Sequence, residues 1–412
     1  MHDPPRQDKP YRVYRAGDRR PDGRVRRTLV WALLGVGIVV AAVALAVAVG
    51  DWRPSASGAA PAPGPGRPTN AALSPAATPS PEPPPPAGST PSPTPGFSVT
   101  AGGDVIGGFA VGDVVASVGS RLFAHVAPVF AKSDFGFVNL ESPLTRGGDA
   151  QSWKDVVIKG DPDLAPAMAA SGINVVTMAN NHAGDMGDSG LLDSIRHCRK
   201  NDIVVVGAGK DLDEAMSSTV LTTADGTKVA FLGFTDVLPA GYPATASSPG
   251  VAPGRADIGA VERAVRRAAR RADFVVVGWH WNFEYKRAPS SLELSEGHAV
   301  VDAGADIVFA HHPHLLNGVE KYGSGLIFYS LGNLVFSGFD GETAETLLVR
   351  ARVSKERIEA QLVPVIGGGT GVPYLARGPQ AQSILRRVKG FSAALDTDVK
   401  IAGGKGYVLL RR

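Results

Sequence analysis

The chain has 412 residues, of which 44% are hydrophobic, so it is long enough to bury a large core. Its net charge is +3, and the first 27 residues alone hold nine lysines and arginines against four acidic residues. The other 385 residues therefore carry about −2, which is +3 less +5. This balance excludes a body that binds nucleic acid through a basic face.

Residues 1–27 are a basic segment, and residues 28–50 follow as 23 residues without a charge. At about 1.5 Å per residue, a helix of this length spans about 34 Å, enough to cross the apolar core of a bilayer. Arginines before this stretch and Asp51 after it place the N-terminus in the cytoplasm. We expect a single-pass anchor in the cell membrane, with the main domain extracellular. A signal peptide cleaved near Ala46–Ala48 is the alternative.

Residues 51–96 hold 15 of the 32 prolines, mixed with alanine, serine, threonine and glycine. Such a composition cannot bury a core and favours an extended, semi-rigid chain. We expect a disordered stalk that holds the main domain away from the membrane. A proline-rich ligand for a recognition module is the alternative.

Short apolar runs alternate with helical patterns from Phe97 onward. Several runs, such as KVAFLGFT and DFVVVGWHW, are continuous rather than alternating, which is typical of strands buried on both faces. The pattern predicts helices at 187–200, 257–271 and 292–303, a hairpin after about residue 340, and a basic helix around 380–390. This order of elements predicts one α/β domain over residues 97–412.

The lone cysteine and an arginine-rich segment are both predicted to belong to helices of this domain. Cys198 stands at helical spacing from Leu191 and Ile195, which predicts a buried position. The arginines of residues 261–271 are expected on a solvated helix face, because acidic residues flank them. Binding of an anionic polymer by these arginines is the alternative.

Polar side chains gather where the predicted strands end, at the edge where open α/β sheets place their sites. Five ends carry carboxylate, amide or imidazole groups: Gly102-Gly103-Asp104, Asn139-Leu140-Glu141, Asn180-Asn181-His182 with Asp185, Gly278-Trp279-His280 with Glu284, and His311-His312-Pro313-His314. If the last run is a strand, His312 and His314 share a face. Carboxylate and imidazole without thiolate suit Zn²⁺, Mn²⁺ or Fe. The sequence therefore predicts a metal centre, and histidines with a purely structural role are the alternative.

Six motifs in one order carry a resemblance to a known family. They are GGDVIGG, DFGFVNLESPLT, SGINVVTMANNHAGDMGDSGLLDSI, GWHWNFEY, DAGADIVFAHHPHLLNGVE and IFYSLGNLVF. Over roughly residues 98–340 the chain resembles the CapA (poly-γ-glutamate capsule synthesis) family, which is similar to the calcineurin-like metallophosphoesterases. The resemblance implies a four-layer αββα sandwich with a two-metal site.

The resemblance also implies a set of metal ligands. Asp104 matches the first-motif carboxylate, Glu141 the metal-bridging carboxylate and Asn181 the amide ligand. His280 matches a ligand to the second metal. His312 and His314 match the closing pair, with one imidazole for each metal.

Further residues are implied to act on the reaction or the substrate. His182 matches the histidine that binds no metal and protonates a leaving group, and Asp185 is expected to orient it. Glu284 is expected to be a ligand, a substrate contact or a general base, and Asn139 a substrate contact. The phosphoesterase pattern is Asp-x-His in the first motif, whereas Ile106 stands at the histidine position here. One metal is therefore expected to lose a nitrogen ligand.

Two functions follow from these features. The first is a metal-dependent hydrolase in the synthesis or export of a capsule or envelope polymer, acting on a phosphoester or an amide. The second is a non-catalytic subunit that binds metal and an anionic polymer beside a membrane synthase. In both, the partners are the membrane, the synthase components and the polymer, and no nucleic acid.

Overall fold

The computed structural model describes residues 95–412. The predicted basic tail, membrane anchor and proline-rich stalk, at residues 1–27, 28–50 and 51–96, lie outside the described residues but for the last two positions of the stalk. Within residues 95–412, no helix combines the length and the apolar character needed to span a bilayer.

The larger of two main sheets has ten strands, in the order β17-β18-β15-β14-β1-β2-β3-β4, with β13 beside β1 and β16 beside β15. Its strands are β1 (Gly96–Val105), β2 (Phe135–Leu140), β3 (Val175–Thr177), β4 (Val204–Val206), β13 (Asn333–Val335), β14 (Glu345–Ser354), β15 (Arg357–Ile366), β16 (Tyr374–Leu375), β17 (Lys400–Ala402) and β18 (Lys405–Arg411). The strands from β1 to β4 run parallel, whereas β14, β15 and β18 form an antiparallel extension.

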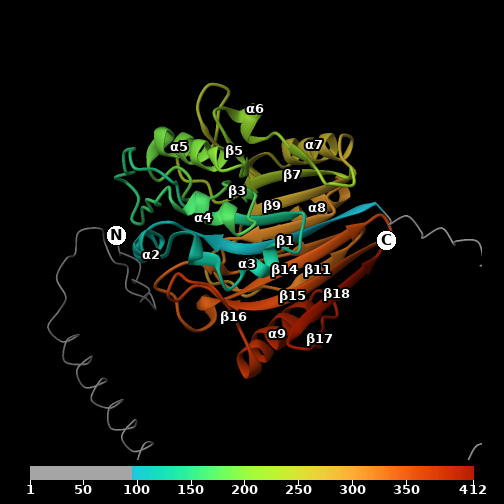
Figure 1. Ribbon diagram of the computed structural model, residues 1–412. Helices are drawn as coiled ribbons and strands as arrows, with labels where there is room; N and C mark the ends of the chain where they lie inside the picture. Colours follow the sequence, from blue (N-terminus) through green and yellow to red (C-terminus); the bar gives the residue numbers. More distant parts are fainter. Residues whose placement is uncertain (1–94) are drawn as a thin grey trace, which may run out of the picture. The chain divides into compact units, whose positions relative to one another are not determined.

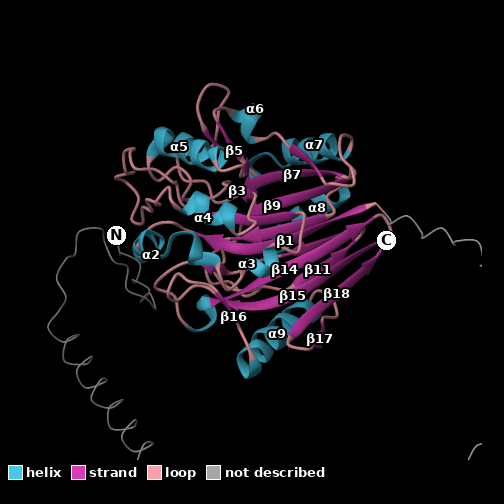
Figure 2. Ribbon diagram, in the orientation of Figure 1, coloured by secondary structure: helices cyan, strands magenta, loops and turns pink. Residues whose placement is uncertain are grey.

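The second sheet has six strands, in the order β11-β12-β10-β9-β7-β6. They are β6 (Thr219–Thr222), β7 (Lys228–Thr235), β9 (Phe274–His280), β10 (Ile307–His311), β11 (Val319–Tyr322) and β12 (Gly325–Phe328). The four central strands are parallel, and a separate short pair joins β5 (Ala208–Gly209) to β8 (Gly250–Val251). In Figure 2 the strands, in magenta, run through the middle of the domain.

Helices cover the outer faces of both sheets, and the last helix packs against the core between the sheets (Figure 1). They are α2 (Ala110–Val118), α3 (Ala127–Phe130), α4 (Leu164–Ala170), α5 (Gly187–Lys200), α6 (Leu212–Ala215), α7 (Ile258–Ala269), α8 (Ser291–Asp302) and α9 (Gly378–Ala393), with 3-10 turns at Gly119–Phe123, Arg255–Asp257 and Gly341–Ala344. The predicted α/β class, the three predicted helices, the hairpin β14–β15 and the basic helix α9 are all confirmed.

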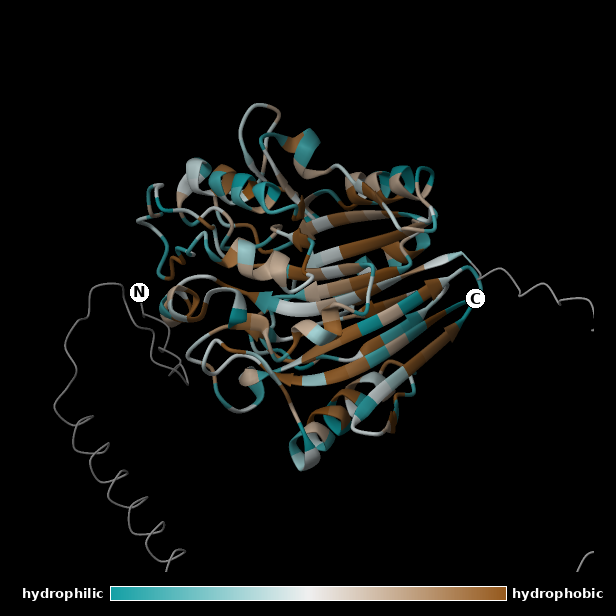
Figure 3. Ribbon diagram, in the orientation of Figure 1, coloured by the Kyte–Doolittle hydropathy of each residue, from teal (hydrophilic) through white to brown (hydrophobic). Residues whose placement is uncertain are grey.

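Three apolar cores lie between the layers. One joins the larger sheet to α2, α3, α4 and α5, one lies between the two sheets, and one joins the second sheet to α6, α7 and α8. Each central strand therefore buries both faces, and this explains why β9 is apolar along most of its length (Figure 3). Phe137 faces the inter-sheet core, whereas its neighbour Val138 faces the helices.

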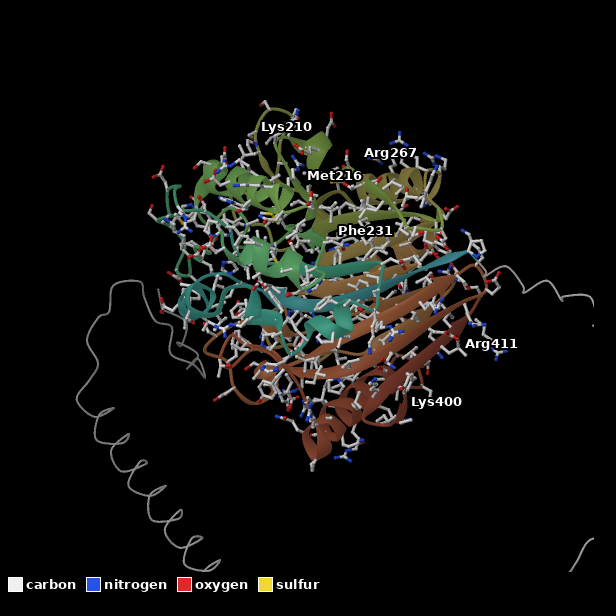
Figure 4. The ribbon with its side chains drawn as sticks, viewed as in Figure 1. Lys210, Met216, Phe231, Arg267, Lys400 and Arg411 are labelled. Carbon is white, nitrogen blue, oxygen red and sulfur yellow. The ribbon has the colours of Figure 1, made fainter. Side chains whose placement is uncertain are left out.

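Cys198 and the arginines of α7 lie where their helical spacing predicts. Cys198 is buried, and burial raises the pKa of its thiol to about 12, so the thiol is inert at neutral pH. The inner face of α7 carries apolar residues such as Val261 and Val265, and its arginines, such as Arg267, are exposed (Figure 4).

Aromatic rings from both sheets meet in the inter-sheet core. Phe231 of β7 (Figure 4) is fully buried there. Its ring centroid lies 5.1 Å from that of Phe135 and 6.3 Å from that of Phe137.

We expect Phe231→Ala to lower the free energy of unfolding by about 3–5 kcal/mol, measured by urea denaturation, because it leaves a cavity between the sheets. Phe283→Ala is the control, since that ring is 73% exposed, and we expect a change within about 0.5 kcal/mol. Equal losses for the two variants would contradict this account of the core.

Candidate metal centre

The carboxyl ends of the parallel strands bring the polar motifs together. Within the larger sheet, Asp104 of β1 is in register with Asn139 of β2. Within the second sheet, His280 of β9 is in register with His311 of β10. Contacts then cross between the sheets, since Nδ1 of His311 lies 3.1 Å from Oδ1 of Asp104. The predicted strand-end cluster therefore forms where the two sheets face each other.

The double glycine of the first motif allows Asp104 to sit in a bulge of β1. The register of β1 shifts between Ala101 and Asp104 against β2, and the backbone N–H of Asp104 donates to the carbonyl of Gly332 over 2.9 Å. A Cβ on Gly103 would lie 1.9 Å from that same carbonyl oxygen, so no side chain fits there. The bulge turns the Asp104 carboxylate toward the cluster.

Two groups of ligand atoms share one carboxylate. The first consists of Glu141, His280 and His312, and the second of Asp104, Glu141 and His314. Within each group the ligand atoms lie within 4.8 Å of one another, and all five side chains are buried. Glu141 is common to both groups, and each group takes one imidazole of the closing pair. This is the arrangement that two neighbouring cations with a bridging carboxylate require.

Several polar atoms of these two ligand groups have no hydrogen-bond partner among the described residues. Oδ2 of Asp104, Oε1 of Glu141 and Nδ1 of His312 are buried and find no hydrogen-bond partner among residues 95–412. Buried polar atoms are nearly always paired, so atoms like these need an explanation. Divalent cations accept carboxylate oxygen and neutral imidazole nitrogen as ligands, and therefore the residues present fit a metal centre.

The pKa values of the two carboxyls are pushed apart. Burial acts to raise the pKa of Asp104, but His311 and His314 outweigh burial and hold that pKa well below its usual range. Burial and the neighbouring Asp104 raise the pKa of Glu141 well above its usual range. Two carboxylates this close cannot both ionise easily, and a cation between them would remove that repulsion.

The imidazoles of the cluster differ in charge. Burial lowers the pKa of His280 well below its usual range, and burial with the nearby His314 lowers the pKa of His312 to about 3. Burial acts in the same sense on His314, but Glu141 and Asp104 overcome it and raise its pKa to about 9. His280 and His312 are therefore neutral at pH 7, which is the form of imidazole that binds metals.

Backbone conformation, and not a shared strand face, brings the closing pair together. The strand β10 ends at His311, so His312 and His314 follow the strand end and do not share a face of a regular strand. Both residues have positive φ angles, 93° and 54°, a region that side chains other than glycine rarely adopt. Their ring centroids lie 5.9 Å apart. Strained backbone of this kind is concentrated at functional sites.

The residues of this cluster lie in a part of the chain that matches one family model. The family model described as bacterial capsule synthesis protein PGA_cap matches residues 98–338, which is more than half of the chain. The chain belongs to this family. All ten residues predicted for the site lie inside the PGA_cap match.

Relatives from three bacteria are similar to this chain. The capsule biosynthesis protein CapA of Bacillus anthracis is 34% identical over 259 residues, which cover 61% of this chain and 63% of that protein. The PGA biosynthesis protein CapA of Bacillus subtilis (strain 168) is 35% identical over 255 residues, which cover 61% and 67%. A probable polyglutamine synthesis accessory protein of Mycobacterium tuberculosis is 31% identical over 221 residues, which cover 51% and 58%. The chain thus spans about two thirds of the length of these relatives, or less.

Solved structures align with this chain at TM-scores below 0.5. A hypothetical protein from Thermus thermophilus gives a TM-score of 0.37 at 16% identity, over 69% of this chain and 100% of that chain. The 5'-nucleotidase from Candida albicans gives a TM-score of 0.36 at 12% identity, over 73% of this chain and 59% of that chain.

Amides line the cluster of this PGA_cap member. Oδ1 of Asn181 lies 2.8 Å from Nε2 of His280, so the predicted amide ligand stands at the first group. Asn139, the expected substrate contact, is fully buried beneath the ligands. Its amide nitrogen donates to Oδ1 of Asp104 over 2.9 Å, and its oxygen accepts from Asn180 over 3.0 Å. Its amide is therefore directed at the ligands and away from solvent.

His182 and Asp185 form a pair beside the cluster, in the geometry predicted for an oriented histidine. Nδ1 of His182 lies 2.7 Å from Oδ2 of Asp185. The other oxygen, Oδ1, accepts from the Tyr242 hydroxyl over 2.7 Å. Glu284, in contrast, is exposed on the loop after β9 and lies outside the buried groups, although its charge acts on Glu141 and His314.

Lys154 is a residue of this site to which no sequence motif points. Its Nζ lies 2.5 Å from Oδ1 of Asp185, 3.1 Å from Nδ1 of His182 and 2.5 Å from the carbonyl oxygen of Asn181. Its side chain is only 13% exposed. Lys154 stands in an irregular loop, and only the fold brings that loop onto Asp185.

Metal should stabilise the protein through Glu141. With free Mn²⁺ at 100 times its Kd, we expect wild type to gain about 2.7 kcal/mol in free energy of unfolding, measured by urea denaturation with and without Mn²⁺. Glu141→Gln should lose most of this gain, because Glu141 is the residue common to both groups. The control His298→Gln, on α8, should keep the gain. A full gain in Glu141→Gln would argue against a bridging role.

Lys154 should matter for stability even without metal. In EDTA we expect Lys154→Met to lower the free energy of unfolding by about 3 kcal/mol, because it removes one partner of a buried ion pair and leaves Asp185 charged. Lys159→Met is the matched control from the same loop, where the side chain is exposed, and a change within about 0.5 kcal/mol is expected. The outcome that contradicts the contact is an equal, small effect of both substitutions on the urea midpoint.

Proposed function

We propose that this protein is a metal-dependent hydrolase that acts in the synthesis or export of a capsule or envelope polymer of the poly-γ-glutamate type. The observation that carries the proposal is the sharing of Glu141 by two buried ligand groups. The names of the relatives, capsule biosynthesis and PGA biosynthesis proteins, support the choice of polymer.

The ligand set defines what a bound metal could supply. Asp104, Glu141 and His314 would hold one cation, and Glu141, His280 and His312 the other, with Asn181 beside His280. Carboxylate, amide and imidazole ligands without thiolate suit Mn²⁺, Zn²⁺ or Fe. When bound, such cations supply Lewis acidity that stabilises charge on a phosphoryl or carbonyl oxygen of the substrate.

The proton chemistry falls to His182. Its Nδ1 is held by Asp185, which fixes the tautomer and orientation of the ring and leaves Nε2 for a leaving group. Lys154 and Tyr242 hold Asp185 in turn, so the pair is fixed before a substrate arrives. Glu284 is proposed as a substrate contact at the exposed edge of the cluster. A phosphoester or an amide bond of the polymer is the group cleaved.

The place of action is part of the proposal and depends on the N-terminal segments. An anchor at residues 28–50 and a stalk at residues 51–96 would hold the domain outside the cell, with the N-terminus in the cytoplasm. In that position the domain would work beside the synthase components of the membrane.

One observation favours a second function, a subunit that binds metal and anionic polymer without cleaving it. Ile106 occupies the place of the usual first-motif histidine, and it is fully buried in the core between the larger sheet and its helices. The first motif therefore contributes one ligand instead of two, which weakens one cation site.

Turnover separates the two functions. We expect the full-length chain with Mn²⁺ to hydrolyse a generic phosphodiester, and His182→Ala to lower kcat by about 10²–10⁴-fold, because it removes the general acid. Metal content, measured by elemental analysis, should stay unchanged in this variant. His197→Ala, at a half-buried position of α5 outside the ligand groups, is the control and should keep wild-type turnover. Bound metal without turnover that depends on His182 would favour the binding subunit, and wild type without bound metal would refute both functions.

A further inference from the structure

The first motif leaves Asp104 without an imidazole from its own strand. Ile106, two residues further along the chain, turns into the core between the larger sheet and the helices. The imidazole that stands beside Asp104 comes instead from the other sheet, where His311 is the last residue of β10. His311 is 0% exposed.

The two oxygens of Asp104 have different surroundings. Oδ1 accepts from the Asn139 amide over 2.9 Å and lies 3.1 Å from Nδ1 of His311. Oδ2 has no hydrogen-bond partner among residues 95–412 and lies 3.4 Å from Nδ1 of His314, within the second ligand group. Asn139 thus holds one oxygen by a hydrogen bond and His311 adds a close polar contact to it, which leaves the other oxygen to the second ligand group.

Packing alone does not account for an imidazole at this position. His311 faces the inter-sheet core, with its ring centroid 6.3 Å from that of Phe137, and Phe309 occupies the same face two residues earlier. Neither ring nitrogen of His311 meets the geometry of a hydrogen bond to any residue from 95 to 412. Burying a polar ring costs free energy that close contact with an opposite charge offsets, and among residues 95–412 the ion-pair contact of His311 is with Asp104.

We propose that His311 is a positioning residue that holds Asp104 for cation binding, in place of the imidazole that the first motif lacks at Ile106. This inference rests on the proposed metal centre. Residues that orient a metal ligand through its second atom typically contribute about 10–100-fold to metal affinity. His311 acts through Asp104, because it belongs to neither group of ligand atoms.

The test compares two substitutions of His311 in the full-length chain by calorimetric titration with Mn²⁺. His311→Leu should weaken Mn²⁺ binding by about 10–100-fold, because nothing then holds Oδ1 of Asp104 from the second sheet. His311→Asn should retain most of the affinity, since the amide nitrogen of asparagine can stand where the imidazole Nδ1 stands. His298→Leu removes an imidazole from α8, outside the cluster, and should bind Mn²⁺ as wild type does.

Thermal melting of the metal-free proteins gives the second readout. Without metal, His311→Leu should lower the melting temperature of wild type but not that of Asp104→Asn, because the loss concerns the contact between His311 and the Asp104 carboxylate. An equal lowering in the wild-type and Asp104→Asn backgrounds would assign His311 to packing and overturn the inference. So would wild-type Mn²⁺ affinity in His311→Leu, while the metal centre itself would stand. If wild type gives no Mn²⁺ binding, the proposed function fails, and the inference fails with it.

Discussion

Two carboxylates and three imidazoles are buried together where the carboxyl ends of two facing sheets meet. Burying charged groups costs free energy, and much of the surrounding structure offsets that cost. The larger sheet contributes the carboxylates and the second sheet the imidazoles. Burial and the charge of Asp104 raise the pKa of Glu141, whereas His311 and His314 hold the pKa of Asp104 below its usual range. Asn139 donates a hydrogen bond to Asp104, and Asn180 donates one to Asn139. Beside the cluster, Lys154 forms an ion pair with Asp185.

Such a cluster needs rigid support, which the three cores provide. Each central strand is clamped between a layer of helices and the opposite sheet, so its end cannot shift without disturbing both cores. The strained residues His312 and His314 depend on this support, because positive φ angles at residues with a Cβ persist only where the surroundings enforce them.

Much of the fold could be predicted from local pattern. The continuous apolar runs indicated strands buried on both faces, and helical spacing placed α5, α7 and α8 within a residue or two of their observed bounds. The gathering of polar side chains could be predicted as well, because carboxyl ends of parallel strands meet at one edge, whereas the roles of single ligands were implied only by the family resemblance and stay predictions. The conformation of the closing pair could not, since Pro313 and its neighbours give no local sign of a left-handed backbone. Lys154 and His311 could not be assigned either, because their contacts depend on how a loop and a second sheet pack onto Asp185 and Asp104.

The direction of β1 decides where the preceding part of the chain joins this domain. The strand begins at Gly96 and reaches Asp104 eight residues later, a length of about 26 Å at about 3.3 Å per residue. Whatever precedes Gly96 in the chain is therefore joined to the domain at the opposite end of the strand from the ligand cluster. The carboxyl ends of the parallel strands, with the ligand cluster, therefore lie away from the point where the preceding chain joins the domain.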